Sequence, residues 1–340
     1  MSLDLNTVWF ILVGVLLAGY AILDGFDLGV GALHLFTRGD HDRRIMINSI
    51  GPVWDGNEVW LVTGGGALFA AFPDVYSTSF SGFYLAFVLL LVALIFRAVA
   101  IDFRSKRPSK RWRKTWDVSF AVSSIVSSLL MGVALGNIVL GLPLTAEGEY
   151  LGGLPGLLRP YPLLVGLTTV ALFAMHGGIY VVMKTEGDLR AQVRSWIPRL
   201  IGLFVACYLL VTVLTLVFIP HMSGTLFDNP VLLAVPILNA LAIANIPREI
   251  HHGRDFRAFL SSCAAMVFLM MLFGIGMYPD MIFSSPIAEN SLTIYNASSS
   301  ARTLRIMLII ALIGMPVVLS YTVSIYWIFR GKVKLDQFSY

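Results

Sequence analysis

A short stretch that begins at Gly51 gathers polar and aromatic residues of a kind that is rare in an apolar segment. From Gly51 to Trp60 it reads Gly-Pro-Val-Trp-Asp-Gly-Asn-Glu-Val-Trp, and a long apolar run follows directly. An ionisable side chain inside a membrane costs about 2.5–3.5 kcal/mol on insertion scales, so Asp55 and Glu58 indicate a function. Helical residues three or four positions apart share a face, which places Trp54 with both carboxylates. This pattern predicts a charged partner, proton transfer or both.

A second carboxylate pair, Asp24 and Asp27, is three residues apart in the glycine-rich run Asp-Gly-Phe-Asp-Leu-Gly-Val-Gly. Two adjacent carboxylates in apolar surroundings cannot both be ionised cheaply. At least one of them is therefore expected to hold a proton at neutral pH, which suits proton exchange.

The composition indicates the class of protein that must position these residues. The chain has 340 residues, of which 57% are hydrophobic and 13% charged, and its mean hydropathy is +0.80. A soluble domain has about 45–50% apolar and about 25% charged residues. The expected fold is therefore an all-α, polytopic membrane protein, and residues 1–340 are expected to form a single transmembrane domain. Cys207 and Cys263 lie in apolar runs and are expected to be buried hydrophobic residues.

Nine segments are long and apolar enough to be membrane spans, each needing about 20 residues. The first follows an N-terminus without a basic region or a small-residue cleavage pattern, so it is expected to be retained rather than removed as a signal peptide. The triple glycine at 64–66 is expected to allow a neighbouring backbone to approach closely. The expected spans are 7–36, 53–73, 77–103, 116–142, 161–184, 197–219, 230–247, 257–278 and 303–330.

Basic residues are concentrated in every second connecting loop, and this pattern predicts the orientation of the chain in the membrane. Of the 24 lysines and arginines, 20 fall on one set of loops, and basic residues collect on the cytoplasmic side of a membrane. The N-terminus is therefore expected outside (periplasmic) and the C-terminus in the cytoplasm. The outer connection 279–302 contains an uncharged, hydroxyl-rich run and is expected to form an ordered cap or a partner surface.

This orientation brings the charged residues of the first four spans to a similar depth near the cytoplasmic side. The favoured interpretation is a route by which protons or cations enter from the cytoplasm. The residues concerned are Asp24, Asp27, Asp55, Glu58, Arg97, Asp102 and Asp117, with Trp54 beside them.

Structural interpretations compete at several of these positions. Asp102 and Asp117 lie close to basic loops and could be interfacial ion pairs. The charge of Asp55 is also favoured by the dipole at a helix N-terminus. Arg97 could serve only to neutralise Glu58 or Asp27.

Other chemistry finds little support in the sequence. His34 and His176 lie in spans, but neither has a second histidine at a pairing distance on its own helix, so both are expected to pack structurally. No phosphate-binding loop, Cys–His metal cluster or nucleophile triad is recognisable. We therefore predict no catalytic residue and no metal ligand in this chain, and no nucleic-acid partner.

Two runs of residues resemble subunit II of the cytochrome bd-type quinol oxidases. The first is Asp24–Gly31, and the second runs from Arg43 through Trp-Asp-Gly-Asn to Trp60. The similarity continues over essentially the whole chain, including Gly132–Asn137 and the outer Ser-Leu-Thr run at 291–293, with fewer matching residues in about 145–255.

The resemblance implies a nine-span subunit in the bacterial cytoplasmic membrane, paired with a homologous subunit I that carries b- and d-type haems and the quinol site. Such a complex reduces dioxygen to water with protons taken from the cytoplasm, and subunit II itself is thought to bind no haem. By position, Asp55 is the main candidate for proton delivery, with Trp54, Asp27, Glu58 and Asp24 beside it, and Arg97 and Asp102 as supporting charges. A structural quinone in subunit II is known in the family, although nothing in this sequence locates it. The presence of a small single-span subunit and the identity of the quinone stay open.

Two other classes of function compete with this interpretation. The first is a proton-coupled secondary transporter with a site at Asp24, Asp27 and Arg97, although the later spans lack the matching set that a repeated architecture would provide. The second is a purely structural role, in which acidic substitutions would change assembly without changing turnover alone.

Overall fold

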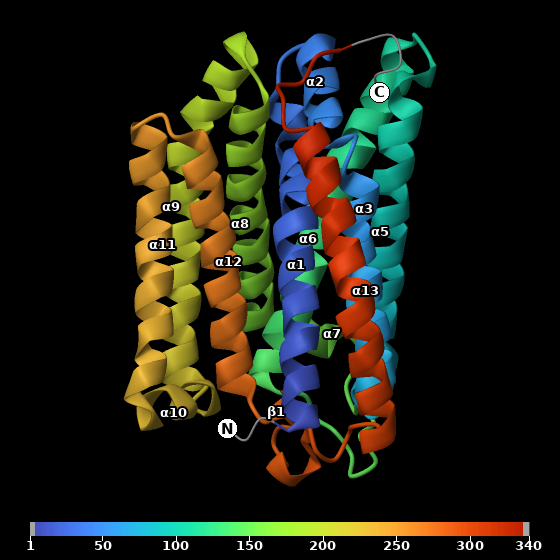
Figure 1. Cartoon of the computed structure of the whole chain (residues 1–340), viewed down its shortest axis with the longest axis vertical. Helices are drawn as coiled ribbons and strands as arrows, with labels where there is room; N and C mark the ends of the chain where they lie inside the picture. Colours follow the sequence, from blue (N-terminus) through green and yellow to red (C-terminus); the bar gives the residue numbers. More distant parts are fainter. Residues whose placement is uncertain (1–3, 336–339) are drawn as a thin grey trace.

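Long helices running up and down form most of the molecule (Figure 1), in a computed structural model that describes residues 4–335 and 340. The long helices are α1 (Leu5–Leu33), α3 (Trp54–Ala71), α5 (Tyr84–Phe103), α6 (Lys110–Leu140), α8 (Pro160–Lys184), α9 (Gly187–Phe218), α11 (Ala234–His251), α12 (Asp255–Met277) and α13 (Ala301–Ile328). The shorter elements are η1 (His34–Phe36), α2 (Asp40–Ile50), α4 (Pro73–Gly82), η2 (Arg104–Lys106), α7 (Leu154–Leu157), α10 (His221–Asp228), η3 (Pro230–Leu233), β1 (Asp280–Ile282), η4 (Ala288–Asn290) and β2 (Leu292–Thr293).

The all-α, polytopic membrane fold is confirmed. Within the part of the chain that the structure describes, eight helices are long and apolar enough to cross a membrane. The expected span at 53–73 corresponds to α3, which has 18 residues, carries Asp55, Asn57 and Glu58 in its first turns, and is not among the eight. The count of nine spans and their orientation stay predictions.

The expected third span at 77–103 is divided in two. Helix α4 begins at Pro73, as suits a residue that lacks a backbone N–H, and ends at Gly82. Phe83 then separates it from α5. The charged end of this span, with Arg97, therefore belongs to α5 alone.

All the basic connections lie at one end of the bundle, the upper end in Figure 1. This end holds α2 and the turns α5–α6, α8–α9 and α11–α12, and α13 also ends there. Helix α1 begins at the opposite end, where Asp4 caps it: the Thr7 N–H donates to the Asp4 carboxylate at 2.8 Å and lowers the pKa of that group. The basic residues that the sequence places on alternate connections therefore gather at one end of the bundle, and the other end carries few of them.

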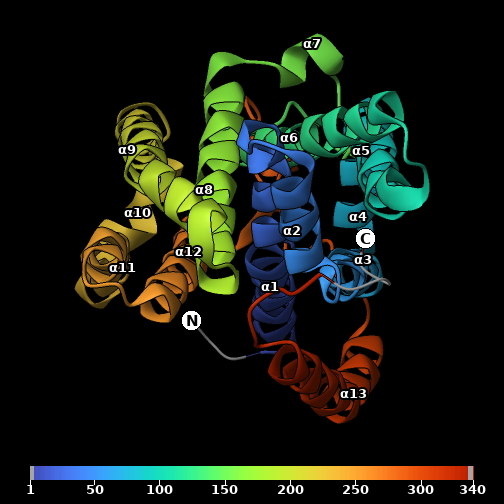
Figure 2. The ribbon, with the colours of Figure 1, turned by 90° about the horizontal axis from the view of Figure 1, so that it is seen from above.

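Helix α1 occupies the middle of the bundle, with α8 on one side and α3 and α6 on the other (Figure 2). Its contact with α8 is close because two glycines face each other: a Cβ on Gly29 would lie 1.8 Å from the carbonyl oxygen of Phe173, and one on Gly177 would lie 2.5 Å from the carbonyl carbon of Gly29. The large core cluster lies largely around α1, α8 and α9. Helix α13 lies at the edge of the bundle in Figure 2, beside α1 and α3.

The segment after α12 folds over the lower end of the bundle. Strands β1 and β2 pair in an antiparallel manner, and Ile282 in β1 and Ile294 directly after β2 are fully buried. The Asn6 side chain donates to the Ile294 carbonyl at 2.7 Å, and Ser299 donates to the Ala70 carbonyl. The expected ordered cap is therefore present.

Candidate functional site

Three helices bring Asp24, Glu58 and Arg97 together inside the bundle. The guanidinium of Arg97, from α5, is fully buried. Its Nη1 lies 2.7 Å from Oδ1 of Asp24 on α1, and its Nη2 donates to Oε1 of Glu58 on α3. Asp24 is fully buried, whereas 25% of the Glu58 side chain is exposed. The arginine thus links a buried carboxylate to one that reaches the protein surface.

Charge is not balanced in this cluster if every carboxyl group is ionised. Asp27 lies one helical turn after Asp24 and is also fully buried, so the cluster contains three carboxyl groups and one guanidinium, which pairs with Asp24 and Glu58. With all three ionised the net charge would be −2, the three negative charges less the one positive. A buried charge without a partner is disfavoured by several kcal/mol, and a carboxyl group avoids that cost by holding a proton. The arrangement is therefore able to take up and release protons.

A short chain of hydrogen bonds holds Asp27 on the other side of the cluster. The Asn57 side chain, from α3, donates to Oδ2 of Asp27 at 2.7 Å and to the Leu23 carbonyl at 3.2 Å. The hydroxyl of Tyr326, from α13, donates to Oδ1 of Asn57 at 2.9 Å. Helices α1, α3 and α13 are thus joined through one buried amide.

The predicted site residues fall into two groups in the structure. Asp24, Asp27, Glu58 and Arg97 come together as just described. Asp55 is exposed in the first turn of α3, three residues before Glu58, and Trp54 beside it is packed into the apolar core.

Asp102 does not join this cluster. It is exposed at the end of α5 and forms no ion pair with any residue that the structure describes. Asp117, by contrast, forms the interfacial ion pairs that its position near a basic loop suggested, with Arg43 and Arg104.

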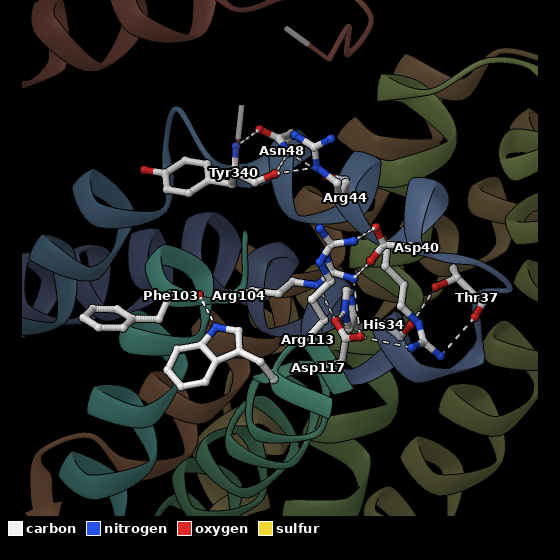
Figure 3. A network of polar contacts seen from close by, with 12 residues as sticks. His34, Thr37, Asp40, Arg44, Asn48, Phe103, Arg104, Arg113, Asp117 and Tyr340 are labelled. Carbon is white, nitrogen blue, oxygen red and sulfur yellow. Dashed lines mark hydrogen bonds and ion pairs between the residues drawn. The ribbon is translucent and has the colours of Figure 1, made fainter. Parts of the chain in front are cut away.

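A second charge network surrounds Asp117 at the upper end of the bundle (Figure 3). His34 Nε2 lies 2.6 Å from Oδ1 of Asp117, and Arg104 Nε donates to the same oxygen at 2.5 Å. Arg43 donates to Oδ2 at 3.0 Å. Arg104 also donates to Asp40 at 2.8 Å, so η1, α2, η2 and α6 are joined around the Asp117 carboxylate. This network fixes the helix ends next to the cluster.

Asn57 and Tyr326 were missed by sequence reasoning as functional residues. Asn57 lies in the polar stretch Gly51–Trp60, and this position is the one feature of the sequence that could have indicated its role. Tyr326 looks like a member of an interfacial aromatic belt, because nothing in the sequence shows that α13 returns beside α1 and α3. From the sequence, His34 was expected only to pack structurally, and Arg104 was counted only among the basic residues of a loop.

The two histidines that the sequence places in spans both make polar contacts within the chain. Both ring nitrogens of His176 are engaged, with Ser262 at 2.7 Å and with the Ile22 carbonyl at 3.0 Å. His34 is held on Asp117 through Nε2. Over residues 4–335 and 340, no group of three or more His, Cys, Asp or Glu side chains is arranged to hold a metal ion.

Comparisons with known proteins agree over almost the entire length. Residues 5–329 match the family described as cytochrome bd terminal oxidase subunit II. The chain belongs to this family. Cytochrome bd-I ubiquinol oxidase subunit 2 from Escherichia coli (strain K12) is 37% identical over 365 residues, covering 98% of this chain and 96% of that protein. Cytochrome bd ubiquinol oxidase subunit 2 from Bacillus subtilis (strain 168) is 33% identical over 333 residues, with 97% of each chain covered.

The fold of this subunit II is also found in a solved structure. A chain of the bd oxidase from Geobacillus thermodenitrificans matches with a TM-score of 0.79 at 18% sequence identity, covering 96% of this chain and 98% of that one. Its apolar helices and its bacterial relatives make this subunit II a multi-pass protein of the bacterial inner membrane, and it belongs to a terminal oxidase.

Proposed function

We propose that this subunit II supports a haem-bearing subunit I and delivers protons to it from the cytoplasm for the reduction of dioxygen to water. One observation carries the proposal: a fully buried guanidinium, Arg97, lies between a buried carboxylate, Asp24, and a partly exposed one, Glu58. The names of the relatives, ubiquinol oxidase subunits, support quinol as the electron donor of the complex.

The proposed route begins at Asp55. Its carboxylate is exposed at the N-terminus of α3 and lies about one helical turn from Glu58. A negative charge at the mouth of a low-dielectric region raises the local concentration of cations. A proton is then taken up by Glu58, passes along the carboxylates beside Arg97, and resides on Asp24 or Asp27 before it leaves for the partner.

The first test is the substitution Asp55→Asn. Loss of this carboxylate is expected to lower quinol-driven oxygen uptake by up to about tenfold, since electrostatic focusing contributes factors of this size while water can still reach Glu58. The measurement is steady-state oxygen consumption by the purified complex at several ionic strengths, because screening by salt should narrow the difference between the two proteins.

Asp74→Asn serves as the matched control, because Asp74 is also exposed in the first turn of a helix but lies at the opposite end of the bundle. Unchanged turnover of Asp55→Asn, with the complex assembled in normal amounts, would remove Asp55 from the route. A visible absorption spectrum of the purified assembly tests the wider proposal: haem bands support the oxidase, whereas a colourless preparation that moves protons would support a transporter.

We also propose that the structural quinone expected in this family lies in a large apolar cavity between the helices. The cavity has a volume of about 650 Å³ and is lined by residues of helices including α1, α5, α6, α8, α9 and α12. Its wall is almost entirely aliphatic and aromatic, and its polar groups are three tyrosines, several threonines and Ser223. Such a lining suits an isoprenoid or acyl chain better than a polar ligand.

Ala134→Phe tests this assignment, because Ala134 lies on the cavity wall and a phenyl ring would occupy part of the volume. The amount of quinone that copurifies per complex, measured by mass spectrometry after solvent extraction, is expected to fall at least about threefold, given the cost of overpacking a filled site. Ala240→Phe, at an exposed position of α11, should leave it unchanged. Equal quinone content in both variants would contradict the assignment.

A further inference from the structure

A second and smaller cavity is lined by Tyr180 and Tyr326, and by Pro52 and Val53 just before α3 begins. Its volume is about 200 Å³, and it is enclosed by α8, α12, the end of α13 and the turn between α2 and α3. A water molecule needs a cavity only a fraction of this size together with two to four polar partners. The cavity is therefore large enough for several water molecules.

The wall of this cavity offers the polar groups that water requires. Lys184 Nζ lies on the wall and uses two of its N–H bonds on the carbonyls of Phe329 and Gly331, which leaves the third. The hydroxyl of Tyr180 donates to the Ser49 carbonyl at 3.0 Å and keeps its acceptor capacity. The Tyr326 hydroxyl can likewise accept from water while it donates to Asn57.

Tyr326 also connects the cavity to the buried carboxylates. Its side chain lines the cavity, and its hydroxyl is bound to the same amide, that of Asn57, that donates to Oδ2 of Asp27. The other oxygen of Asp27, Oδ1, is buried and accepts no hydrogen bond from the protein groups that the structure describes. A buried carboxyl oxygen without a hydrogen-bond donor is unfavourable, so a water molecule that reaches this atom would stabilise it.

We propose that this cavity is a water-filled second entrance for protons, leading to Asp27, and that Asn57 and Tyr326 are its positioning residues. The inference rests on the proposed function in proton delivery. An amide does not carry a proton at low cost, so Asn57 is not itself a relay. The proton moves from water to Oδ1 of Asp27, while Asn57 and Tyr326 hold the carboxyl group and the end of the water file next to each other.

The geometry makes the two entrances separate. The first follows the exposed side of α3 through Asp55 and Glu58 to Arg97. The second reaches α1 from the side of α8, α12 and α13, and meets Asp27 rather than Asp24. Since Asp24 and Asp27 are one turn apart on α1, both entrances supply the same buried pair.

Tyr326→Phe is the first test, because it removes only the hydroxyl and leaves the ring in contact with Phe26. Oxygen uptake at saturating quinol is expected to fall about 3- to 10-fold, the loss that one buried hydrogen bond commonly causes. A larger solvent isotope effect in D₂O should accompany it, and a merely structural role would not produce that change. Tyr321→Phe, at an exposed position of the same helix, is the matched control. Equal rates and isotope effects in the two variants would overturn the inference.

Water access is tested independently with Ser49→Cys in the intact complex. Ser49 lines the cavity although it is almost fully buried, so a cysteine there should react with a negatively charged methanethiosulfonate reagent added to inverted membrane vesicles. Ser127→Cys is the control, because Ser127 is equally buried in α6 and does not line the cavity. Labelling at both native cysteines is subtracted using the parent complex. Labelling of Ser49→Cys no greater than that of Ser127→Cys would contradict a water-filled cavity.

The outcomes also separate this inference from the proposed function. If substitutions of Asp24 and Asp55 slow turnover while Tyr326→Phe behaves like its control, only the second entrance is refuted. If none of the acidic substitutions slows turnover in assembled complexes, proton delivery by this subunit is refuted as a whole.

Discussion

Arg97→Leu is expected to leave little assembled complex in the membrane. The guanidinium is fully buried between Asp24 and Glu58, and leucine would leave their carboxyl groups without a cation. Removing one partner of a buried ion pair destabilises a protein by about 3–5 kcal/mol, a large fraction of the stability of most proteins. The measurement is the amount of subunit II in detergent-extracted membranes, together with its resistance to thermal aggregation.

A triple substitution distinguishes the effect of losing the Arg97 charge from the effect of changing the shape of its side chain. Arg97→Leu combined with Asp24→Asn and Glu58→Gln removes every charge of the triad, and we expect it to recover a substantial part of the assembled protein. Arg305→Leu, which replaces an exposed arginine near the start of α13, is the control and should assemble normally. If Arg97→Leu assembled as well as this control, the buried ion pairs would not be stabilising the bundle.

Much of the architecture could be predicted from the sequence, because apolar length and loop charge are local properties. The expected spans correspond to the long helices, and the basic loops lie at one end of the bundle. The division of the third span at Phe83 could not be predicted, since both sides are apolar or hydroxylic and helix-compatible. The apolar character of helix α3 is weak because its first turns carry Asp55, Asn57 and Glu58.

Contacts between distant segments were harder to predict than the segments themselves. The sequence left the partner of Arg97 open between Glu58 and Asp27, whereas the structure pairs this arginine with Glu58 and with Asp24. Tyr326 and Asn57 are 269 residues apart, and only the return of α13 brings them together.

The glycines show the same limit of sequence reasoning. Close approach of a neighbouring backbone was expected at the triple glycine 64–66, but a Cβ built on Gly64 meets a side chain, that of Leu17 at 3.2 Å, and within the described chain nothing outside their own helix lies within 4 Å of one built on Gly65 or Gly66. The tightest helix contact instead uses Gly29 and Gly177, which no local pattern distinguishes from other glycines.

Asp24→Asn is expected to reduce oxygen uptake by about 100-fold or more while leaving the complex assembled. Asparagine preserves the size of the side chain and can still meet Arg97 through its amide oxygen, and Glu58 remains as the charged partner of that arginine. What is lost is a group that binds and releases a proton, and a positioned acid or base contributes about 10²–10⁴-fold to rate. The measurement is turnover normalised to haem absorbance, with single-turnover proton uptake followed by a pH indicator.

Asp102→Asn is the matched control, because Asp102 is an acidic residue of α5 near the same end of the bundle but is exposed and lies outside the cluster. Its turnover should stay within about twofold of the parent, since an exposed carboxylate contributes little. Equal turnover in the two variants would mean that Asp24 only packs beside Arg97. Slow turnover in Asp24→Asn with fast electron transfer to the haems would instead place the defect in proton supply, the step in which the buried carboxylate of Asp24, paired with Arg97 of α5, is able to act.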